Sequence, residues 1–135
     1  YGDGEQKRCF SYIDDCLRCL IPMLDQKNLN KQVINIGPDE EFVTVNKVVE
    51  ICSNITGSNL EAVYKEDRPR EVKHATCSAD KARKLLNYET KVSLNDGVKK
   101  TYDYIKKRGP KDFNYRLTIE IDNDLTPDTW KNKEI

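Results

Sequence analysis

Apolar side chains recur at helical spacing in four separate stretches of this chain. In the first stretch they step by three and four residues, which places them on one face of a helix: Ile13, Cys16, Leu17, Leu20, Ile21 and Leu24. Ser11 and Asp14 have the spacing of a capping box, so we expect the helix to begin at Ser11. Pro22 interrupts the pattern and predicts that the helix kinks or ends early.

The other three helical patterns each begin at a residue that can cap a helix N-terminus. Thr44 precedes the second pattern, which Gly57 ends, and Ser78 precedes a short third one. Ser93 begins a second capping box, and the helix after it is expected to end at Gly109. The apolar positions of these helices are Val45, Val48, Val49, Cys52 and Ile55; Ala82, Leu85 and Leu86; and Leu94, Val98, Tyr102 and Ile105.

Four short segments have the pattern of β-strands. Residues 7–10 follow a Gly2-Asp3-Gly4 turn, and residues 32–36 form an apolar run that ends before a Gly-Pro pair. Residues 60–64 are a third candidate, and residues 115–121 alternate apolar and polar side chains with a period of two. About four helices and four short strands predict an α/β fold, a small mixed domain.

The composition narrows the classes of partner. The 23 lysines and arginines balance the 23 aspartates and glutamates, so bulk charge predicts no binding to nucleic acid or to anionic membranes. No apolar run approaches the length of a membrane span. The five cysteines are an odd number without framework spacing, which favours reduced thiols and a cytoplasmic protein.

Two motifs of nucleotide-dependent enzymes have a simpler explanation here. Gly2 and Gly4 are similar to the start of a dinucleotide fingerprint, but Lys7 occupies the position of its third glycine. The pair is better explained as a tight turn. Tyr102 and Lys106 have the spacing of a known catalytic tyrosine–lysine pair, yet the tyrosine belongs to an apolar helix face, so we favour core packing.

The cysteines and the histidine predict no redox or metal chemistry. Cys16 and Cys19 have redox-like spacing, but they lie in the middle of an apolar helical run rather than at a helix start. His74 is the only histidine and has no matching set of cysteines, so we expect a polar contact in a strand or loop. We therefore predict no catalytic and no metal-binding residue.

Two segments carry arginines suited to binding an anion. Arg8 directly precedes the first predicted helix, and Arg68 and Arg70 flank Pro69 in a charged loop. A planar guanidinium binds phosphate through two parallel hydrogen bonds, and a proline stiffens the loop that carries it. The alternative from residue types alone is that these are solvated surface arginines paired with carboxylates.

Taken in order, the motifs along the chain resemble those of a known family. They are Y-G-D-G-E-Q-K-R-C-F-S-Y-I-D-D at 1–15, V-I-N-I-G at 33–37, R-P-R-E at 68–71, A-D-K-A-R-K-L-L-N-Y at 79–88 and S-L-N-D-G-V at 93–98. The series resembles the C-terminal, substrate-binding part of the extended short-chain dehydrogenases/reductases. That family comprises nucleotide-sugar epimerases, among them UDP-glucose 4-epimerase-like enzymes, and nucleotide-sugar dehydratases and decarboxylases. The resemblance covers residues 1 to about 108.

The resemblance implies roles for four residues. Arg8 and Arg68 match the arginines that contact the diphosphate of the nucleotide sugar. Glu71 matches the acid that binds a ribose hydroxyl, because a carboxylate accepts hydrogen bonds from a diol. Phe10 matches an aromatic position beside the nucleotide.

The chain also departs from the family pattern. Cys9 replaces an aspartate, Arg70 replaces a glycine, and Glu71 is longer than the usual aspartate. The NAD-binding half of the family, with its glycine fingerprint and catalytic pair, has no counterpart in the sequence. We therefore expect a fragment lacking the Rossmann half, which is inactive alone and holds no NAD, although the intact enzyme uses NAD. Residues 1–108 are the expected nucleotide-sugar-binding lobe, and residues 109–135 an extension with one strand and a polar tail.

The expected function is to bind the substrate of an NAD-dependent epimerase that acts on a UDP-sugar. A 4,6-dehydratase or a UDP-glucuronate decarboxylase is the close alternative, because the residues that decide the reaction lie largely in the NAD-binding half. A module that binds the nucleotide sugar without catalysis is a further alternative. Apolar surface left exposed without the NAD-binding half would favour self-association of the chain.

Overall fold

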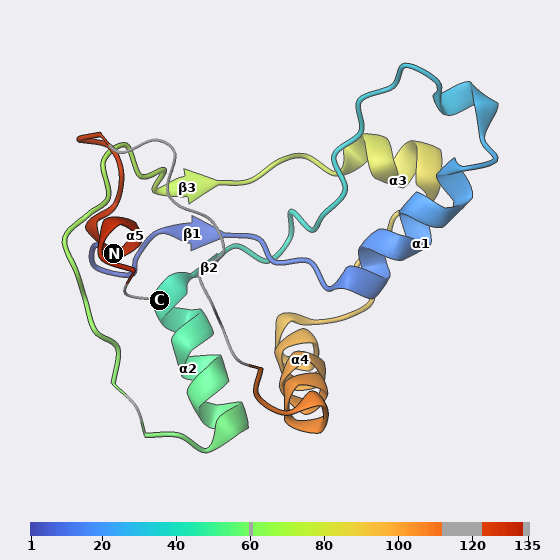
Figure 1. The fold of residues 1–135 in the computed structure, drawn as a ribbon. Coiled ribbons are helices and arrows are strands. Elements are labelled where there is room, and N and C mark those ends of the chain that lie inside the picture. The colour runs from blue at the N-terminus through green and yellow to red at the C-terminus, as the bar shows by residue number, and fades with distance from the viewer. Residues whose placement is uncertain (60, 112–122, 134–135) are drawn as a thin grey trace.

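The computed structural model describes residues 1–59, 61–111 and 123–133. These residues form an α/β fold with five α-helices, one 3₁₀-helix and three very short strands (Figure 1). In chain order the elements are β1 (Lys7–Arg8), α1 (Ile13–Met23), η1 (Lys27–Leu29), β2 (Val43–Thr44), α2 (Val45–Thr56), β3 (His74–Ala75), α3 (Asp80–Leu86), α4 (Leu94–Arg108) and α5 (Asp128–Lys131).

The three strands form one mixed sheet with β1 in the centre. Their order is β2-β1-β3, and β1 pairs antiparallel with β2 and parallel with β3. In this register Lys7 lies opposite Thr44 on one side and His74 on the other. The central strand therefore brings the beginning of the chain against the segment that follows the Arg68 loop.

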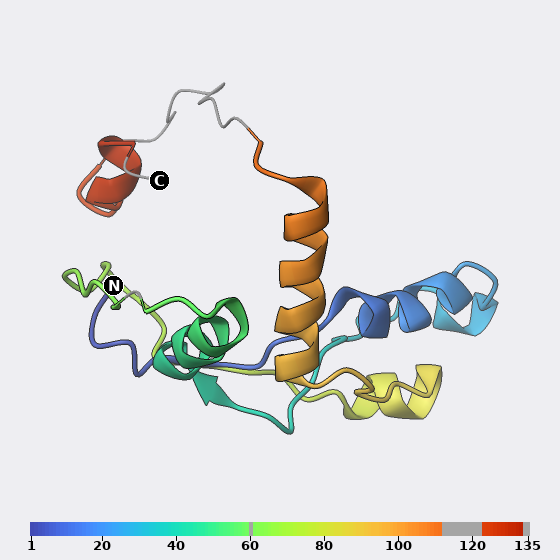
Figure 2. The same cartoon turned by 90° about the horizontal axis from the view of Figure 1, so that it is seen from below.

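The helices pack in two pairs on different parts of the molecule. α2 packs against α4, and α1 packs against α3. Figures 1 and 2 show α1 and α3 together at the end of the molecule farthest from α5. The sheet and the loops beside it lie between these two ends, which leaves the Arg68 loop next to α5 and the N-terminus.

Two of the predicted helix caps are confirmed. The hydroxyl of Thr44 accepts a hydrogen bond from the backbone N–H of Lys47 at 3.1 Å, and Gly57 ends α2 with a φ of 67°. The hydroxyl of Ser93 accepts from the backbone N–H of Asp96 at 3.2 Å, as a capping box requires. Both caps satisfy backbone donors that the first helical turn leaves without partners.

The other two predicted helix starts are wrong by one residue. Tyr12 is the N-cap of α1, and Ser11 makes no side-chain capping bond. The helix continues through Pro22 and ends one residue later, in agreement with the early end that this proline predicted. Ala79 is the N-cap of α3, although the Ser78 hydroxyl still accepts from the backbone N–H of Asp80 at 3.2 Å. Side chains of this kind stabilise tight turns as well as helix starts, so sequence spacing does not separate the two cases.

Strands are shorter and fewer than the pattern predicted. The strand expected over residues 7–10 is confirmed only at Lys7–Arg8. Residues 32–36 and 61–64 have no strand neighbour, so those two predictions are wrong over these residues. In residues 32–36 the apolar side chains of Ile34 and Ile36 pack against the hydrophobic core instead. Residue 60 and the strand predicted over residues 115–121 lie outside the described residues.

The core is small and lies where α1, η1 and α3 meet. Its buried members are Cys19, Leu29, Ala79, Ala82, Leu86 and Tyr88, with Met23, Ile34, Ile36 and Leu85 packed against them. Cys19 is 2% exposed, and this burial raises the pKa of its thiol, which opposes formation of a reactive thiolate. Core packing rather than redox chemistry therefore accounts for this cysteine.

Two buried or paired carboxylates hold the core segments in place. Asp15 is 1% exposed, accepts hydrogen bonds from the backbone N–H groups of Lys91 and Val92 at 3.1 Å, and pairs with Arg18. Asp39 accepts from the backbone N–H of Ala79 at 2.8 Å and pairs with Arg83. The hydrogen bonds from Arg83 and from that N–H lower the pKa of Asp39 to about 2.

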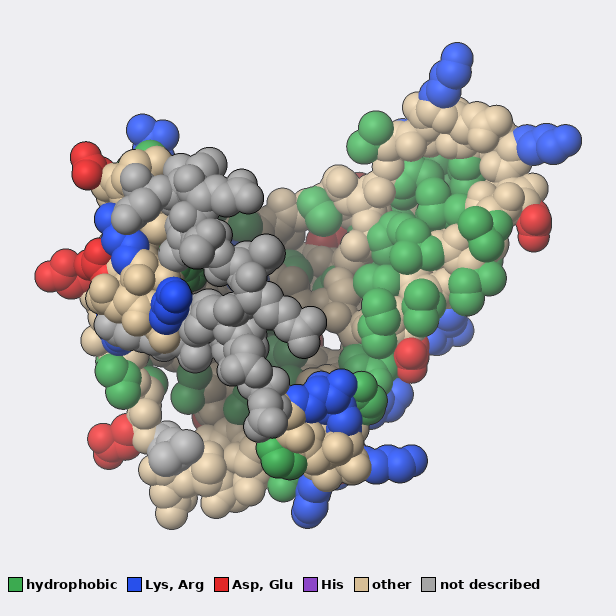
Figure 3. Space-filling view, in the orientation of Figure 1, with side chains coloured by type: hydrophobic (Ala, Val, Ile, Leu, Met, Phe, Trp, Pro, Cys, Tyr) green, Lys and Arg blue, Asp and Glu red, His purple; other side chains and the backbone are tan. Residues whose placement is uncertain are grey.

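A large part of the apolar pattern faces solvent. The exposed apolar face of α1 consists of Ile13, Leu17, Leu20, Ile21 and Leu24, of which Leu24 is 84% exposed. Figure 3 shows hydrophobic side chains gathered over this end of the molecule. Val49 and Ile105, expected to face inward, are also exposed, because α2 and α4 cover only the faces that they turn to each other. Among the described residues, no helix is long and apolar enough to cross a membrane.

Candidate functional site

Three of the four predicted site residues come together at one carboxylate. Arg8 ends β1, and Arg68 and Glu71 lie in the loop before β3, so the parallel pairing of these strands brings them together. One oxygen of Glu71 accepts a hydrogen bond from Nη2 of Arg8 at 2.9 Å. Its other oxygen lies 3.0 Å from Nη2 of Arg68. A single carboxylate therefore bridges two guanidinium groups from separate segments.

Backbone carbonyls fix the side chain of Arg8. Its Nη2 also donates to the carbonyl of Val72 at 2.7 Å, and its Nη1 donates to the carbonyl of Lys7 at 2.7 Å. The side chain of Arg8 is 28% exposed, so part of it remains accessible to solvent. An arginine held in this way loses little further conformational entropy when it binds an anion.

Arg68 is held by an aromatic ring instead. Its guanidinium carbon lies 4.7 Å from the centre of the Tyr1 ring, which is the distance of a cation–π contact. Its Nε–H is buried and has no hydrogen-bond acceptor within the described part of the chain. A buried donor without an acceptor costs about 1–3 kcal/mol, so this unpaired N–H lowers the stability of the loop.

The charges of the cluster suit an anion. The two guanidinium groups exceed the one carboxylate of Glu71, and both arginine side chains are about one third exposed. Diphosphate oxygens can take the place of a carboxylate as acceptors from guanidinium groups. The arrangement can therefore exchange the internal ion pairs for an incoming diphosphate.

Phe10 does not join this cluster. It is 40% exposed and lines a separate, mainly apolar cavity of about 260 Å³ beside α4, together with Tyr12, Leu94 and Val98. Phe10 is thus close to Arg8 in the sequence, but in the structure its side chain lines a separate cavity.

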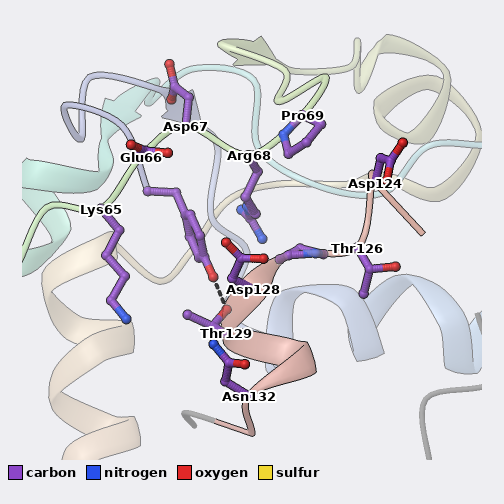
Figure 4. A pocket seen from close by; sticks show the side chains of 12 residues that line it. Lys65, Glu66, Asp67, Arg68, Pro69, Asp124, Thr126, Asp128, Thr129 and Asn132 are labelled. Atoms are coloured by element: carbon purple, nitrogen blue, oxygen red, sulfur yellow. Dashed lines mark hydrogen bonds between the residues drawn. The ribbon is translucent and has the colours of Figure 1, made fainter. Parts of the chain in front are cut away.

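A second cavity lies beside Arg68 and includes residues that the sequence did not point to. It has a volume of about 450 Å³ and is lined by Tyr1, Lys65, Glu66, Asp67, Arg68, Pro69, Asp124, Thr126, Pro127, Asp128, Thr129 and Asn132 (Figure 4). The hydroxyls of Tyr1 and Thr129 form a hydrogen bond across it. Sequence reasoning missed both Tyr1, which stands next to the glycine turn, and the polar tail around Thr129.

The glycine turn serves contacts within the chain rather than a cofactor. Gly2 and Gly4 have φ values of 68° and 74°, and a Cβ at either position would overlap a neighbouring side chain. That neighbour is Asp67 for Gly2 and Asn46 for Gly4, so side chains fill the space that a pyrophosphate would need. The residues of this turn therefore do not fit NAD, and the turn instead fixes the path into β1.

The histidine lies beside this cluster in the sheet without contacting Glu71, and the tyrosine–lysine pair lies on α4. His74 lies in β3, as expected for a strand or loop position, with its ring centre 5.9 Å from that of Phe42. Lys106 lies one turn beyond Tyr102 on α4, and its ammonium is 5.7 Å from the tyrosine ring. Neither group contacts Arg8 or Glu71 among the interactions of residues 1–59, 61–111 and 123–133.

Comparison with known proteins identifies the relatives of this chain. The sequence profile of the family described as GDP-mannose 4,6 dehydratase matches residues 1–101. UDP-glucuronate 4-epimerase from Thermodesulfobacterium geofontis is 35% identical over 107 residues, which are 79% of this chain and 32% of that protein. UDP-N-acetyl-alpha-D-glucosaminuronate decarboxylase from Bacillus cytotoxicus is 27% identical over 113 residues, with 79% of this chain and 35% of that protein covered.

Solved structures agree with these relatives. UDP-glucuronic acid 4-epimerase from Bacillus cereus, in complex with UDP-glucuronic acid and NAD, matches with a TM-score of 0.73 and 37% identity. The match covers 81% of this chain and 35% of the epimerase. UDP-glucose 4-epimerase from Thermotoga maritima, with UDP-glucose, matches with a TM-score of 0.73 and 35% identity over 80% of this chain and 34% of its own length. The chain thus spans about a third of the length of these relatives.

Proposed function

We infer the function from the family of this chain. The chain belongs to the GDP-mannose 4,6 dehydratase family, within the nucleotide-sugar epimerases and dehydratases of the extended short-chain dehydrogenases/reductases. We propose that it binds the nucleotide sugar of an NAD-dependent UDP-sugar epimerase. Residues 1–108 form the nucleotide-sugar-binding lobe in this proposal, and residues 109–135 are an extension of it. NAD and the hydride transfer that it supports belong to the intact enzyme. The chain alone holds the substrate and is inactive.

The observation that carries this proposal is the Glu71 carboxylate between Arg8 and Arg68. A diphosphate displaces this carboxylate from the guanidinium groups, because its oxygens bring more negative charge and more acceptors. Glu71 then becomes available to accept a hydrogen bond from a ribose hydroxyl. Binding at the nucleotide in this way would hold the attached sugar in one position for chemistry elsewhere in the enzyme.

The choice of a UDP-sugar and of epimerisation rests on the relatives. Three of those described above are named for or solved with UDP-glucuronate or UDP-glucose, and all three share more than a third of their aligned residues with this chain. The decarboxylase from Bacillus cytotoxicus supports the alternative reaction. A 4,6-dehydratase or a decarboxylase would use the same diphosphate site, since the arginine cluster does not touch the reacting carbon.

We also propose that the chain is cytoplasmic and associates with itself. All five cysteines are free thiols, as expected in a reducing compartment. The exposed apolar face of α1 is the surface that a second copy would cover, because a contiguous apolar patch of this kind gains free energy when it is removed from water.

Calorimetric titration of the chain with UDP and with UDP-glucose tests the proposed function. The parent should release or absorb heat with both ligands, and the double variant Arg8→Ala, Arg68→Ala should bind at least about tenfold more weakly, given the value of hydrogen bonds to charged groups. The matched control is Lys107→Ala, Arg108→Ala, which removes the same charge at the exposed end of α4. Equal affinity in the two double variants, or no heat with the parent, would contradict the proposal.

A further inference from the structure

The C-terminal tail, residues 123–133, lies beyond the part of the chain that matches the family profile, which ends at residue 101. Its helix α5 nevertheless lies against the Arg68 loop and forms one wall of the 450 Å³ cavity (Figure 4). In Figure 1 this helix sits beside the N-terminus, at the end of the molecule that carries the loop. A segment outside the family profile therefore shares a cavity with an arginine of the proposed diphosphate site.

Tyr1 fastens the tail to that arginine. Its hydroxyl bonds to the hydroxyl of Thr129 on α5, and its ring packs against the guanidinium of Arg68. Helix α5 has only four residues and none of them is buried, and a helix of this length is marginal in water by itself. Segments with few buried contacts open at a low free energy, so the position of the tail depends on individual bonds such as this one.

The tail also brings negative charge into the cavity. Asp124 and Asp128 line it together with Arg68, and Figure 4 shows the guanidinium of Arg68 directed into the space between Tyr1 and Asp128. A phosphate group bound to Arg68 with the tail in place would therefore lie in the same cavity as two carboxylates. Like charges repel each other more strongly in a partly enclosed site than in bulk water, so the tail opposes the binding of an anion at Arg68.

We propose that the C-terminal tail is an autoinhibitory strap, which closes the Arg68 side of the proposed diphosphate site until a nucleotide displaces it. This inference rests on the proposed function, because it assumes that Arg68 binds the diphosphate. Binding then requires the bond between Tyr1 and Thr129 to break and α5 to leave the cavity with its aspartate. The observed affinity is reduced in proportion to the fraction of chains whose tail is open.

Thr129→Val tests the fastening without changing any charge. Valine is similar in shape to threonine but has no hydroxyl, so the variant loses the bond to Tyr1. It should bind UDP about two- to tenfold more tightly than the parent, since the loss of one neutral hydrogen bond favours the open tail. Thr56→Val is the matched control, because it removes a hydroxyl that donates to the carbonyl of Cys52 at the end of α2, and it should bind as the parent does.

The charge of the tail is tested by the double variant Asp124→Asn, Asp128→Asn. It should bind inorganic pyrophosphate about three- to tenfold more tightly than the parent, a range that allows for solvent screening. Asp14→Asn with Asp25→Asn removes the same charge at exposed positions on and just after α1 and is the matched control. An equal increase in both double variants would overturn the specific effect of the tail.

The single tryptophan reports on the position of the tail. Trp130 follows Thr129 on α5 and is 49% exposed. Addition of UDP should increase the quenching of Trp130 fluorescence by acrylamide along the binding curve that calorimetry gives, because the displaced tail exposes the indole more fully. Thr129→Val should show part of this increase before any nucleotide is added.

The outcomes separate the strap from the proposed function. Unchanged or weaker binding of UDP by Thr129→Val, or Trp130 quenching that stays constant while calorimetry reports binding, overturns the strap. In those outcomes the proposed function stands if the Arg8→Ala, Arg68→Ala variant still loses affinity. Absence of heat with UDP in both the parent and Thr129→Val overturns both proposals.

Discussion

Glu71 is the residue on which the proposed binding site depends, because its carboxylate contacts both arginines. In the family pattern this position is a shorter aspartate, and the longer side chain reaches from the Arg68 loop to Arg8. In the proposed site, the carboxylate therefore competes with an incoming phosphate at both guanidinium groups. The same group is proposed to accept a ribose hydroxyl once it is displaced.

Replacing Glu71 by glutamine separates these two roles. The neutral amide releases the arginines, so inorganic pyrophosphate should bind about three- to tenfold more tightly, a range that allows for solvent screening at this partly exposed site. The affinity for UDP should increase less than the affinity for pyrophosphate, because the variant also loses the carboxylate that would accept a hydrogen bond from the ribose. Titration calorimetry with the two ligands measures the difference.

Glu66→Gln is the control for this effect, since it removes one negative charge from the same loop without touching the arginine pair. An equal increase in pyrophosphate affinity in the Glu66 variant would mean that the overall charge governs affinity, and not the contacts of Glu71 with Arg8 and Arg68. A loss of pyrophosphate affinity in the Glu71 variant would mean that Glu71 positions the arginines rather than competing with the ligand.

At the scale of elements, local signals in the sequence predicted helices better than strands. The caps at Thr44 and Ser93 and the stop at Gly57 depend on neighbouring residues, so spacing alone revealed them. The strands are only two residues long, and their pairing joins segments far apart in the chain, which local patterns do not encode. Helix α5 has four residues without apolar side chains at helical spacing, so no sequence pattern predicts it.

The residues of the candidate site also fall into those that the sequence predicted and those that it did not. Family resemblance pointed to Arg8, Arg68 and Glu71, but their meeting at one carboxylate depends on the parallel pairing of β1 with β3. Tyr1 and the tail were missed because their role depends on a contact between the two ends of the described chain. Physical contact across the fold, rather than residue type, decides which polar side chains form a site.

The capping difference between Ser11 and Ser93 has a measurable consequence. Ser93→Ala should lower the free energy of unfolding by about 1 kcal/mol, because it leaves a helix N–H without its acceptor. Ser11→Ala should change it by a few tenths of a kcal/mol at most, since Ser11 makes no capping bond and surface substitutions away from such features have small effects. Chemical denaturation of the two variants and the parent measures both values, and equal losses would contradict the assignment of the N-caps.

At the scale of the whole molecule, the chain has a small core and a large exposed apolar face on α1. We expect the parent to self-associate as its concentration rises. Leu17→Glu together with Ile21→Glu should shift the population to monomer, because the two charges lie on that face. Sedimentation velocity over a range of concentrations measures the change.

Val63→Glu is the matched control, because Val63 is 81% exposed but lies in the loop after α2 rather than on α1. It should associate like the parent. A parent that stays monomeric at every concentration, or a control that dissociates as fully as the α1 variant, would contradict the proposed role of this face.

The central claim is that Arg8 and Arg68 together bind the diphosphate of a nucleotide sugar. A crystal structure of the chain with UDP-glucose tests it most directly, because it locates the diphosphate and the side chain of Glu71 in one measurement. The account predicts phosphate oxygens within hydrogen-bond distance of both guanidinium groups, with Glu71 released from at least one of them. A nucleotide bound elsewhere, with the Glu71 bridge intact, would contradict it.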